Sequence, residues 1–356
     1  MKKKVCMVVP SFSAKGGITS VVSGYKSSQL VHDYDVRFIE SYCDGSKAKK
    51  ILHAICAYAK YMWIVVFWKP QIVHVHSSFG ASFFRKIPFI TIANRYKIPI
   101  INHIHGADFE EFYWKASEKK KKKIAHVYNL CTKIIALSDE WKDKLKCIIN
   151  ADKINVIENY GIINENAIKA RKNKKNTHTI LFLGFLCKRK GCYDIPKVLE
   201  IVKQKIPDVC FVLAGSGEKE EISRIIKDNS IENIRFPGWI RGDVKHKYLT
   251  NCDLFFLPSY NEGMPMSILD AMGYGIPIIS TNVGGISKIV HNDENGYIFK
   301  PGDVEGMAKA ICELLINNEK RYTMGVNSAK IVIEGYSLSN HCRKIEKIYA
   351  ECIAVD

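Results

Sequence analysis

The chain has 356 residues, of which 47% are apolar and 25% charged, and its formal net charge is +17. This length and apolar fraction exceed what one compact core needs and exclude a disordered or fibrous chain, so we expect two globular domains. The twelve cysteines stand singly, with no C-x-x-C pair and no Cys/His cluster at metal-ligand spacing, which excludes a disulfide framework and favours a reducing, cytoplasmic compartment.

Two segments near the N-terminus imitate membrane signals. The opening "MKKKVCMVVPS" has an apolar run of about six residues, shorter than the seven to fifteen of a secretory signal, and predicts a first buried strand instead. The stretch from Ile51 to Pro70 is interrupted by Lys60, whereas a membrane span needs about 20 apolar residues. We expect a helix followed by a strand there.

The positive charge lies mainly in the first half of the chain. Residues 1–160 carry 26 basic and 13 acidic side chains, and residues 161–356 carry 27 and 23. The densest run, "EKKKKK" at 118–123, is typical of a solvated helix face. Together with Trp114 and with the lysines at 47, 49 and 50, it also fits contact with anionic lipid, worth about 1 kcal/mol per cation. We leave both interpretations open and expect no nucleic-acid partner, because no binding motif accompanies the charge.

Short apolar runs alternate with helical patterns in two series. The first series comprises "VCMVVP", "DVRFIE", "QIVHVHS", "IPIINHIHG", "KIIALS" and "KINVIENYG". The second comprises "TILFLG", "VCFVLAG", "NIRFPG", "DLFFLPS", "IPIIST" and "GYIF". Such alternation predicts α/β domains built on parallel sheets.

The predicted architecture is therefore two doubly wound, Rossmann-like domains facing each other across a cleft. We assign residues 1–163 to the first domain, 164–177 to a polar linker and 178–337 to the second domain. Residues 338–356 carry an apolar stripe at helical spacing and predict a closing helix that returns towards the first domain.

The most informative stretch runs from Leu257 to Gly285. It predicts a strand, a small-residue loop, a helix that begins near Pro265 and ends near Gly275, and a second strand. Ligands bind beyond the carboxyl ends of parallel strands, and a helix N-terminus favours phosphate. Backbone N–H groups are expected to point towards such a ligand at Gly263, Met264 and Met266.

This stretch contains two carboxylates in apolar surroundings. Glu262 lies in the loop and Asp270 two turns along the predicted helix. An ionised carboxylate taken out of water costs several kcal/mol unless it is compensated, so both need partners. The hydroxyls of a nucleotide sugar would supply them. A capping charge at Glu262 and a salt-bridged helix residue at Asp270 are the alternative.

The segment "PSYNEGMPMSILDAMGYGIPIISTNVGG" resembles the hallmark of retaining glycosyltransferases of the GT-B fold, glycosyltransferase family 4 type. In that family the acid that matches Glu262 contacts hydroxyls of the donor sugar, and the acid that matches Asp270 holds the ribose. The family has Glu at the second position. The shorter Asp implies a longer or water-bridged contact.

A second loop, "FLGFLCKRKGCYDI", resembles the family element whose Arg and Lys neutralise the donor pyrophosphate. Lys190 matches the Lys. Phe185 occupies the Arg position, which leaves Lys188 or Arg189 as substitutes. The resemblance also implies that Gly215 and Gly217 line the loop near the base.

The first half resembles the family more faintly. Gly16 and Gly17 match its Gly-Gly turn after the first strand, where the backbone approaches donor phosphate and acceptor. His105 resembles the His beside the donor sugar. Three further histidines alternate with apolar residues and are expected to be structural members of strands: His74, His76 and His103.

The resemblance thus implies a retaining enzyme that moves a sugar from a nucleoside-diphosphate sugar to an acceptor hydroxyl. We expect a glycan or glycolipid acceptor in cell-envelope polysaccharide biosynthesis, and a cytoplasmic protein peripheral on an anionic membrane. The expected catalytic residues are Glu262, His105 and Lys190. The expected donor-binding residues are Gly16, Gly17, Arg189, Lys190, Gly215, Gly217, Glu262, Gly263, Met264, Pro265, Met266 and Asp270. No cofactor or metal is expected, because Lys190 and the helix end supply the positive charge.

Two other functions stay open. A sugar-nucleotide epimerase of the same fold would use the same pocket without an acceptor. A catalytically weak partner subunit of another transferase would account for the departures at Phe185 and Asp270. A redox dinucleotide enzyme is disfavoured, since no G-x-G-x-x-G follows the first strand of either half.

Overall fold

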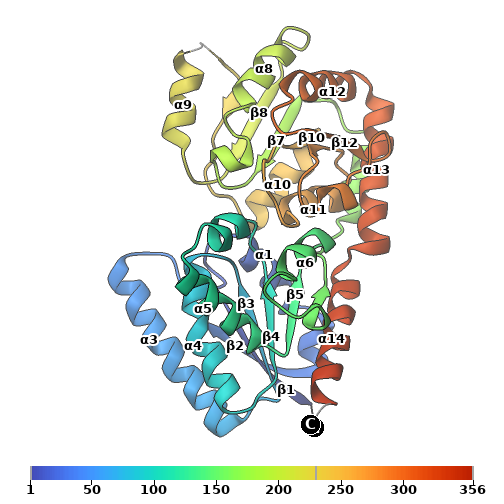
Figure 1. The fold of residues 1–356 in the computed structure, drawn as a ribbon. Helices are drawn as coiled ribbons and strands as arrows, with labels where there is room; N and C mark the ends of the chain where they lie inside the picture. Colours follow the sequence, from blue (N-terminus) through green and yellow to red (C-terminus); the bar gives the residue numbers. More distant parts are fainter. Residues whose placement is uncertain (1, 229–230, 355–356) are drawn as a thin grey trace. The chain divides into compact units, whose positions relative to one another are not determined.

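A computed structural model describes residues 2–228 and 231–354 (Figure 1). The chain divides into two compact units. Unit 1 comprises Met1–Asn159 together with Leu338–Asp356, and unit 2 comprises Tyr160–Ser337. The polar interval 164–177, expected to be a linker, contains helix α7 (Glu165–Arg171) and lies in unit 2.

Unit 1 is built on a six-stranded parallel sheet with the strand order β2-β1-β3-β4-β5-β6. Its strands are β1 (Lys3–Val9), β2 (Tyr34–Glu40), β3 (Ile72–Ser77), β4 (Ile100–Ile104), β5 (Lys133–Ala136) and β6 (Ile154–Val156). Each coincides with one of the apolar runs of the first series, although β1 and β2 begin at Lys3 and Tyr34, before their runs start. The opening segment is therefore a buried strand, as predicted.

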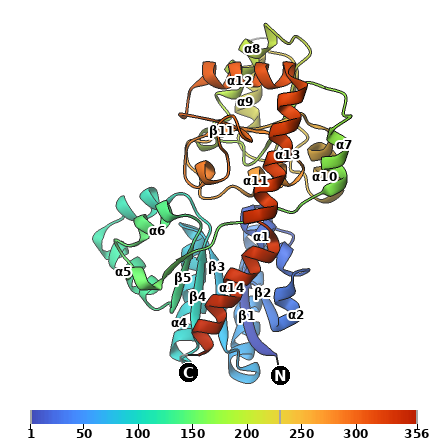
Figure 2. The same ribbon diagram turned by 90° about the vertical axis from the view of Figure 1, so that its right-hand side faces the viewer.

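Helices cover both faces of this sheet. They are α1 (Gly17–Tyr25), α2 (Gln29–Asp33), α3 (Lys47–Trp63), α4 (Ala81–Arg95), α5 (Glu118–Asn129), α6 (Asp139–Leu145) and α14 (Leu338–Ile353), with short turns η1 (Ile64–Trp68), η2 (Glu110–Trp114) and η3 (Ala151–Lys153). The main apolar cluster joins one sheet face to α3, η1, α4, α5 and α6. Helix α14 buries its predicted stripe against the other face, where Figure 2 shows it crossing the strands.

Unit 2 repeats the design with a parallel sheet of order β12-β11-β10-β7-β8-β9. Its strands are β7 (Thr179–Leu183), β8 (Cys210–Ala214), β9 (Ile234–Arg235), β10 (Leu254–Leu257), β11 (Ile278–Thr281) and β12 (Gly296–Phe299). All six lie in the second series of apolar runs. The predicted α/β class with two doubly wound sheets is confirmed.

The helices of unit 2 are α7, α8 (Ile195–Lys203), α9 (Lys219–Asp228), α10 (Gly242–Asn251), α11 (Met266–Gly273), α12 (Val304–Ile316) and α13 (Asn318–Gly335), with turns η4 (Lys188–Lys190) and η5 (Ile286–Lys288). Helix α8 packs against α12, and α11 packs against α13. The side chains of Asp303 and Asn317 cap the starts of α12 and α13 by accepting backbone N–H groups.

The apolar run of residues 51–70 forms one continuous helical segment, α3 followed by η1. Within the described residues this segment, Lys47–Trp68, is the one helix long and apolar enough by length and composition to cross a membrane, and 28% of its most apolar window is buried. The helix expected in this stretch is confirmed, but the strand expected after it is wrong, because residues 64–68 form the helical segment η1 and the next strand, β3, begins at Ile72.

A buried carboxylate fastens the first strand of unit 2 to its neighbour. Asp253 precedes β10 and accepts hydrogen bonds from the backbone N–H groups of Thr177 and Thr179, each at 3.0 Å. It also pairs with Lys174 at 2.5 Å, and its side chain is 1% exposed. Burial raises the pKa of Asp253, but the ion pair and hydrogen bonds outweigh it and hold the pKa below its usual value.

We predict that Asp253→Ala lowers the free energy of unfolding by about 3 kcal/mol, because Lys174 and two backbone N–H groups would lose their buried partner. Asp208→Ala is the matched control. Asp208 pairs with His178 but is 73% exposed, so its loss should cost less than about 1 kcal/mol. Urea unfolding followed by circular dichroism compares the two variants.

The pH dependence follows from the pKa of Asp253, which is depressed in the folded state. The difference in stability between the two variants should therefore persist above about pH 4 and shrink as the pH falls below it. Equal losses at neutral pH would contradict this account.

Candidate functional site

The candidate site of unit 2 lies where the order of the sheet reverses. Strands β7 and β10 are neighbours, yet the chain leaves β7 towards β8 and β9 on one side and leaves β10 towards β11 and β12 on the other. In open parallel sheets the loops beyond the carboxyl ends of such a pair diverge and leave room for a ligand. Here those loops are residues 184–194 and 258–265.

The two loops are fastened to each other through backbone groups. The N–H of Tyr260 donates to the carbonyl of Arg189 at 2.7 Å, and the Arg189 guanidinium donates to the carbonyl of Asn261 at 2.9 Å. A Cβ on Gly191 would lie 1.9 Å from the carbonyl oxygen of Pro258, so only glycine permits this approach. Arg189, expected to bind donor, therefore holds the loop that carries Glu262.

The loop after β8 packs equally closely on the loop after β7. The N–H of Leu186 donates to Ser216 and its carbonyl accepts from Glu218, both at 2.8 Å, which forms a parallel bridge to Gly217. A Cβ on Gly215 would lie 1.7 Å from the carbonyl oxygen of Gly184. Gly215 and Gly217, the two glycines predicted to bind donor in this loop, thus both lie at the contact between the β7 and β8 loops.

Glu262 and Lys190 meet at the switch point. Lys190 Nζ forms an ion pair with Glu262 Oε1, and the Ser259 hydroxyl donates to the same oxygen at 2.6 Å. The side chains of Lys190 and Glu262 are 14% and 6% exposed. Two predicted residues that are 72 positions apart therefore form one charged, nearly buried unit. Ser259 was missed, although it belongs to the same motif.

The loop after Glu262 leads directly into helix α11. Pro265 is the residue before the helix, Met266 is its first residue, and Met264 is buried. The N–H of Gly285 donates to the carbonyl of Gly263 at 2.7 Å, which fixes this loop to the one after β11. The predicted helix boundaries are therefore confirmed.

Asp270 has a protein partner. Its carboxylate pairs with Lys245 of α10, and the two side chains are 15% and 26% exposed. This ion pair compensates the charge of Asp270 and explains how a carboxylate is accommodated in an otherwise apolar helix. Lys245 was missed from the sequence, because nothing in "GDVKHKYLTN" marks one of its lysines as the partner of a residue on another helix.

Phe185 takes the place of the family's Arg and is 51% exposed. The next residue, Leu186, is buried and bonded to the β8 loop. Lys188 is exposed on the turn η4, whereas Arg189 is engaged with the carbonyl of Asn261. Among the cations of this loop, Lys190 is the one paired with Glu262.

In unit 1 the predicted glycines follow β1. Gly16 has φ of 140° and precedes α1, which begins at Gly17. A Cβ at either position would meet no atom within 4 Å among the described residues, so space is open above this turn. The preceding loop is held by the N–H of Ser11, which donates to Tyr42 at 2.7 Å.

His105 follows β4 and joins a group of imidazoles. Its N–H backbone group donates to Ser77 at 2.8 Å, and its Nε2 lies 2.9 Å from His76 Nδ1. Burial, with a smaller contribution from neighbouring histidines, lowers the pKa of His105 to about 3. His74, His76 and His103 are members of strands β3 and β4, as expected.

Two family models match the chain in adjacent blocks. The model described as "Glycosyltransferase Family 4" matches residues 21–160, and the model described as "Glycosyl transferases group 1" matches residues 164–331. The two blocks fall almost entirely in unit 1 and unit 2. The fold and these matches define a glycosyltransferase of the GT-B class. The chain belongs to the glycosyltransferase family 4 type.

Curated relatives agree with this membership. An uncharacterized glycosyltransferase of Haemophilus influenzae is 30% identical over 228 residues, 62% of this chain and 60% of that protein. The UDP-Gal:alpha-D-GlcNAc-diphosphoundecaprenol alpha-1,3-galactosyltransferase of Escherichia coli is 27% identical over 310 residues, 80% of this chain and 76% of that protein. The chain thus spans about three fifths of the length of the Haemophilus relative.

Solved structures with the same fold cover nearly the whole chain. Sucrose-phosphate synthase from Thermosynechococcus elongatus aligns with a TM-score of 0.79 at 17% identity and covers 100% of both chains. Anabaena HepE in complex with UDP-glucose aligns with a TM-score of 0.74 at 19% identity, covering 98% of this chain and 99% of that one. At these identities the likeness shows the fold.

We predict that Gly215→Ala destabilises unit 2 by about 3 kcal/mol, because the added methyl would have to push the β7 and β8 loops apart. Gly335→Ala is the control. A Cβ at Gly335 would have no atom of the described residues within 4 Å. Ala at this helix end should therefore leave the free energy of unfolding unchanged or raise it by up to about 1 kcal/mol. Thermal unfolding of both purified variants checks the difference. A Gly215→Ala protein as stable as the wild type would contradict the close packing.

Proposed function

We propose that this protein transfers a sugar from a nucleoside-diphosphate sugar to an acceptor hydroxyl with retention of the anomeric configuration. The observation that carries the proposal is the Lys190–Glu262 ion pair at the switch point of unit 2, inside the residues that match glycosyl transferases group 1. A cation and a carboxylate held together there offer one partner to a diphosphate and one to sugar hydroxyls.

Each charged group receives a role in this proposal. Lys190 and the N-terminal end of α11 stabilise the leaving diphosphate. Glu262 binds the donor sugar, and Asp270 binds the ribose while Lys245 holds its carboxylate. Arg189 acts on the loop rather than on the donor, because its guanidinium donates to the carbonyl of Asn261.

Unit 1 contributes the groups that the family resemblance assigns to the donor sugar and the acceptor. These are His105 and the Gly16–Gly17 turn. In front-face displacement the bond from the anomeric carbon to the diphosphate oxygen breaks, and the acceptor oxygen bonds to the same face of the sugar. The departing diphosphate oxygen takes the acceptor's proton. The protein then contributes mainly positioning and charge stabilisation.

Neither a cofactor nor a metal is required for transfer in this proposal. Lys190 supplies positive charge where a divalent ion would otherwise act. The sequence contains one Asp-x-Asp pair, Asp33 and Asp35, and it stands at the amino end of β2. Ligand sites of parallel sheets lie at the carboxyl ends, so this pair is poorly placed to hold a nucleotide-bound ion.

The relatives support a UDP-sugar donor and a lipid-linked glycan acceptor. The Escherichia coli relative is named for UDP-Gal and a diphosphoundecaprenol-linked sugar, and Anabaena HepE was solved with UDP-glucose. We propose the same classes of donor and acceptor here, in cell-envelope polysaccharide biosynthesis. Twelve free cysteines favour a reducing, cytoplasmic location.

Helix α3 supports a peripheral position on an anionic membrane. One of its faces exposes large apolar side chains over nearly five turns: Ile51, Leu52, Ile55, Met62, Trp63 and, on η1, Phe67. Exposed lysines stand at its start and middle: Lys47, Lys49, Lys50 and Lys60. A contiguous apolar face bordered by cations fits the headgroup region of anionic lipid. Figure 1 shows α3 as an outer helix of unit 1.

Family membership favours transfer over the two alternatives. An epimerase would form a new sugar nucleotide without an acceptor. A partner subunit would bind lipid and lack donor turnover. The Lys190–Glu262 pair persists in this chain despite Phe185, and Asp270 keeps a cationic neighbour. Both observations support an active donor site.

We predict that Glu262→Gln lowers kcat roughly 100-fold and changes the donor dissociation constant by less than about threefold. The reason is that Glu262 contacts the sugar, where positive charge develops, whereas the nucleotide is held by other groups. Initial rates with a radiolabelled UDP-sugar and calorimetric titration of UDP give the two quantities.

Glu294→Gln is the control for this prediction, because Glu294 is an exposed carboxylate of the same unit. It should retain wild-type rates. Loss of UDP binding in Glu262→Gln, with normal turnover of the donor that still binds, would overturn the assigned role.

We also predict that Phe67→Asp weakens binding to phosphatidylglycerol vesicles roughly tenfold, because it removes a large apolar group from the membrane face. Ile316→Asp on α12 is a matched control, since Ile316 is 68% exposed and Phe67 is 70% exposed. Co-sedimentation with vesicles at low and high salt measures both. Equal binding of the two variants would exclude α3 as the contact face.

A further inference from the structure

One face of the unit 1 sheet carries a cluster of imidazoles beside its apolar side chains. His74 and His76 stand two residues apart on β3, and His103 is the register partner of His76 on β4. Side chains at these positions therefore share one face. This is the face that α14 covers, and all three histidines are 0% exposed.

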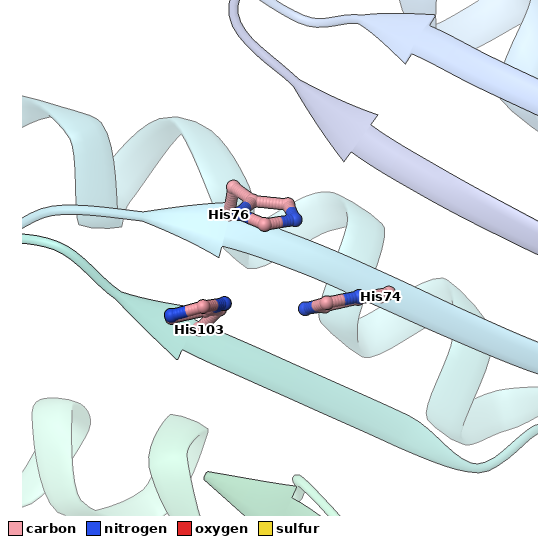
Figure 3. A group of neighbouring side chains, drawn as sticks. All are labelled: His74, His76 and His103. Atoms are coloured by element: carbon pink, nitrogen blue, oxygen red, sulfur yellow. The ribbon is translucent and has the colours of Figure 1, made fainter. Parts of the chain in front are cut away.

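The three rings are close together. Their centroids lie 4.3 Å apart for His74 and His76, 5.1 Å for His76 and His103, and 5.8 Å for His74 and His103. One ring nitrogen from each lies within 4.8 Å of the other two. Figure 3 shows His74 and His103 with a nitrogen of each facing the other ring and His76 beside them.

Four nitrogen atoms of this group have no hydrogen-bond partner among the described residues. They are Nε2 of His74, Nε2 of His76 and both ring nitrogens of His103. A buried polar atom without a partner costs roughly 1–3 kcal/mol, so such a concentration is expensive unless a non-protein group satisfies it.

Hydrogen bonds on the outer side orient two of the rings. His74 Nδ1 lies 2.7 Å from the hydroxyl of Tyr349 on α14, and His76 Nδ1 lies 2.9 Å from His105 Nε2. In both rings Nε2 is then the nitrogen that has no hydrogen-bond partner among the described residues. Metal-binding histidines use the same arrangement, in which the second nitrogen is held by a neighbour.

We propose that His74, His76 and His103 form a buried binding site for a transition-metal ion of the Zn²⁺ class. Imidazole nitrogen suits Zn²⁺, Co²⁺ and Ni²⁺ rather than Mg²⁺ or Ca²⁺. Bonds of about 2.0–2.1 Å require the ligand nitrogens to stand about 3.4 Å apart, so ring rotations must draw them inward from 4.8 Å or less. A fourth ligand would be water or hydroxide.

Such an ion would have a structural role. It would cross-link β3 to β4 and, through His76, fix the ring of His105. The ion would take no part in the chemistry of transfer, and it would reach the proposed donor-sugar residue His105 only through the hydrogen bond with His76. The sequence did not indicate the site because His103 lies 27 positions after His76, too far apart for a local metal-binding pattern.

The test uses the purified full-length chain. The protein is stripped with a chelator, incubated for hours with Zn²⁺ or Co²⁺ so that the buried site has time to open, and desalted. Metal content is then measured by plasma mass spectrometry. We expect about one equivalent per chain in the wild type, and a Co²⁺ form with the strong visible absorption of tetrahedral coordination.

His103→Gln should lose that equivalent, and it breaks no hydrogen bond to the described residues. His126→Gln is the control, because His126 is exposed on α5 and should leave metal content unchanged. Metal content well below one equivalent in the wild type, or equal retention in the two variants, would overturn the proposal. If His103→Gln does not fold, the wild-type Co²⁺ spectrum decides alone, and a weak octahedral spectrum would contradict the site.

Discussion

The site of unit 2 depends on backbone packed directly against backbone at the carboxyl edge of the sheet. The loops after β7 and β8 approach so closely that a methyl group on Gly215 would lie 1.7 Å from a carbonyl oxygen. The loops after β7 and β10 are joined by the bond from Tyr260 to Arg189, and that after β11 holds Gly263. Loops fastened in this way are preorganised, so bound ligand need not supply the cost of ordering them.

This packing brings oppositely charged side chains together where they are almost fully buried from solvent. Lys190 and Glu262 arrive from loops that the chain separates by 72 residues, and Asp270 receives Lys245 from another helix. Buried ion pairs contribute little net stability, because desolvation offsets their attraction. Net stabilisation therefore does not explain the Lys190–Glu262 pair at the switch point, which fits the ligand-binding role proposed for it. The fastening of β7 to β10 is instead supplied by Asp253, which lies at the other end of these strands.

Local sequence patterns predicted the fold well, since every strand is a short apolar run followed by a turn. Glu262 also stood out as a carboxylate in apolar surroundings, whereas Lys190 was predicted only through the resemblance of its loop to a family motif. Pairing between distant residues was not predictable in the same way. Nothing in the sequence around Lys245 indicates that it pairs with Asp270. Each of the three histidines, considered alone, looks like an ordinary member of a strand. The solvent exposure of the apolar side chains on α3 could not be predicted either, because an apolar stripe in the sequence has the same pattern whether it faces a core or solvent.

The central claim is that the Lys190–Glu262 pair marks a nucleotide-sugar site. Calorimetric titration of UDP, GDP, ADP and CMP into the wild type, Lys190→Ala and Lys188→Ala tests it most directly. We expect one nucleoside diphosphate to bind the wild type and Lys188→Ala alike, since Lys188 is exposed on the same turn. Lys190→Ala should bind it about 30-fold more weakly, which corresponds to about 2 kcal/mol. Absence of binding to the wild type, or equal affinity in Lys190→Ala, would contradict the account.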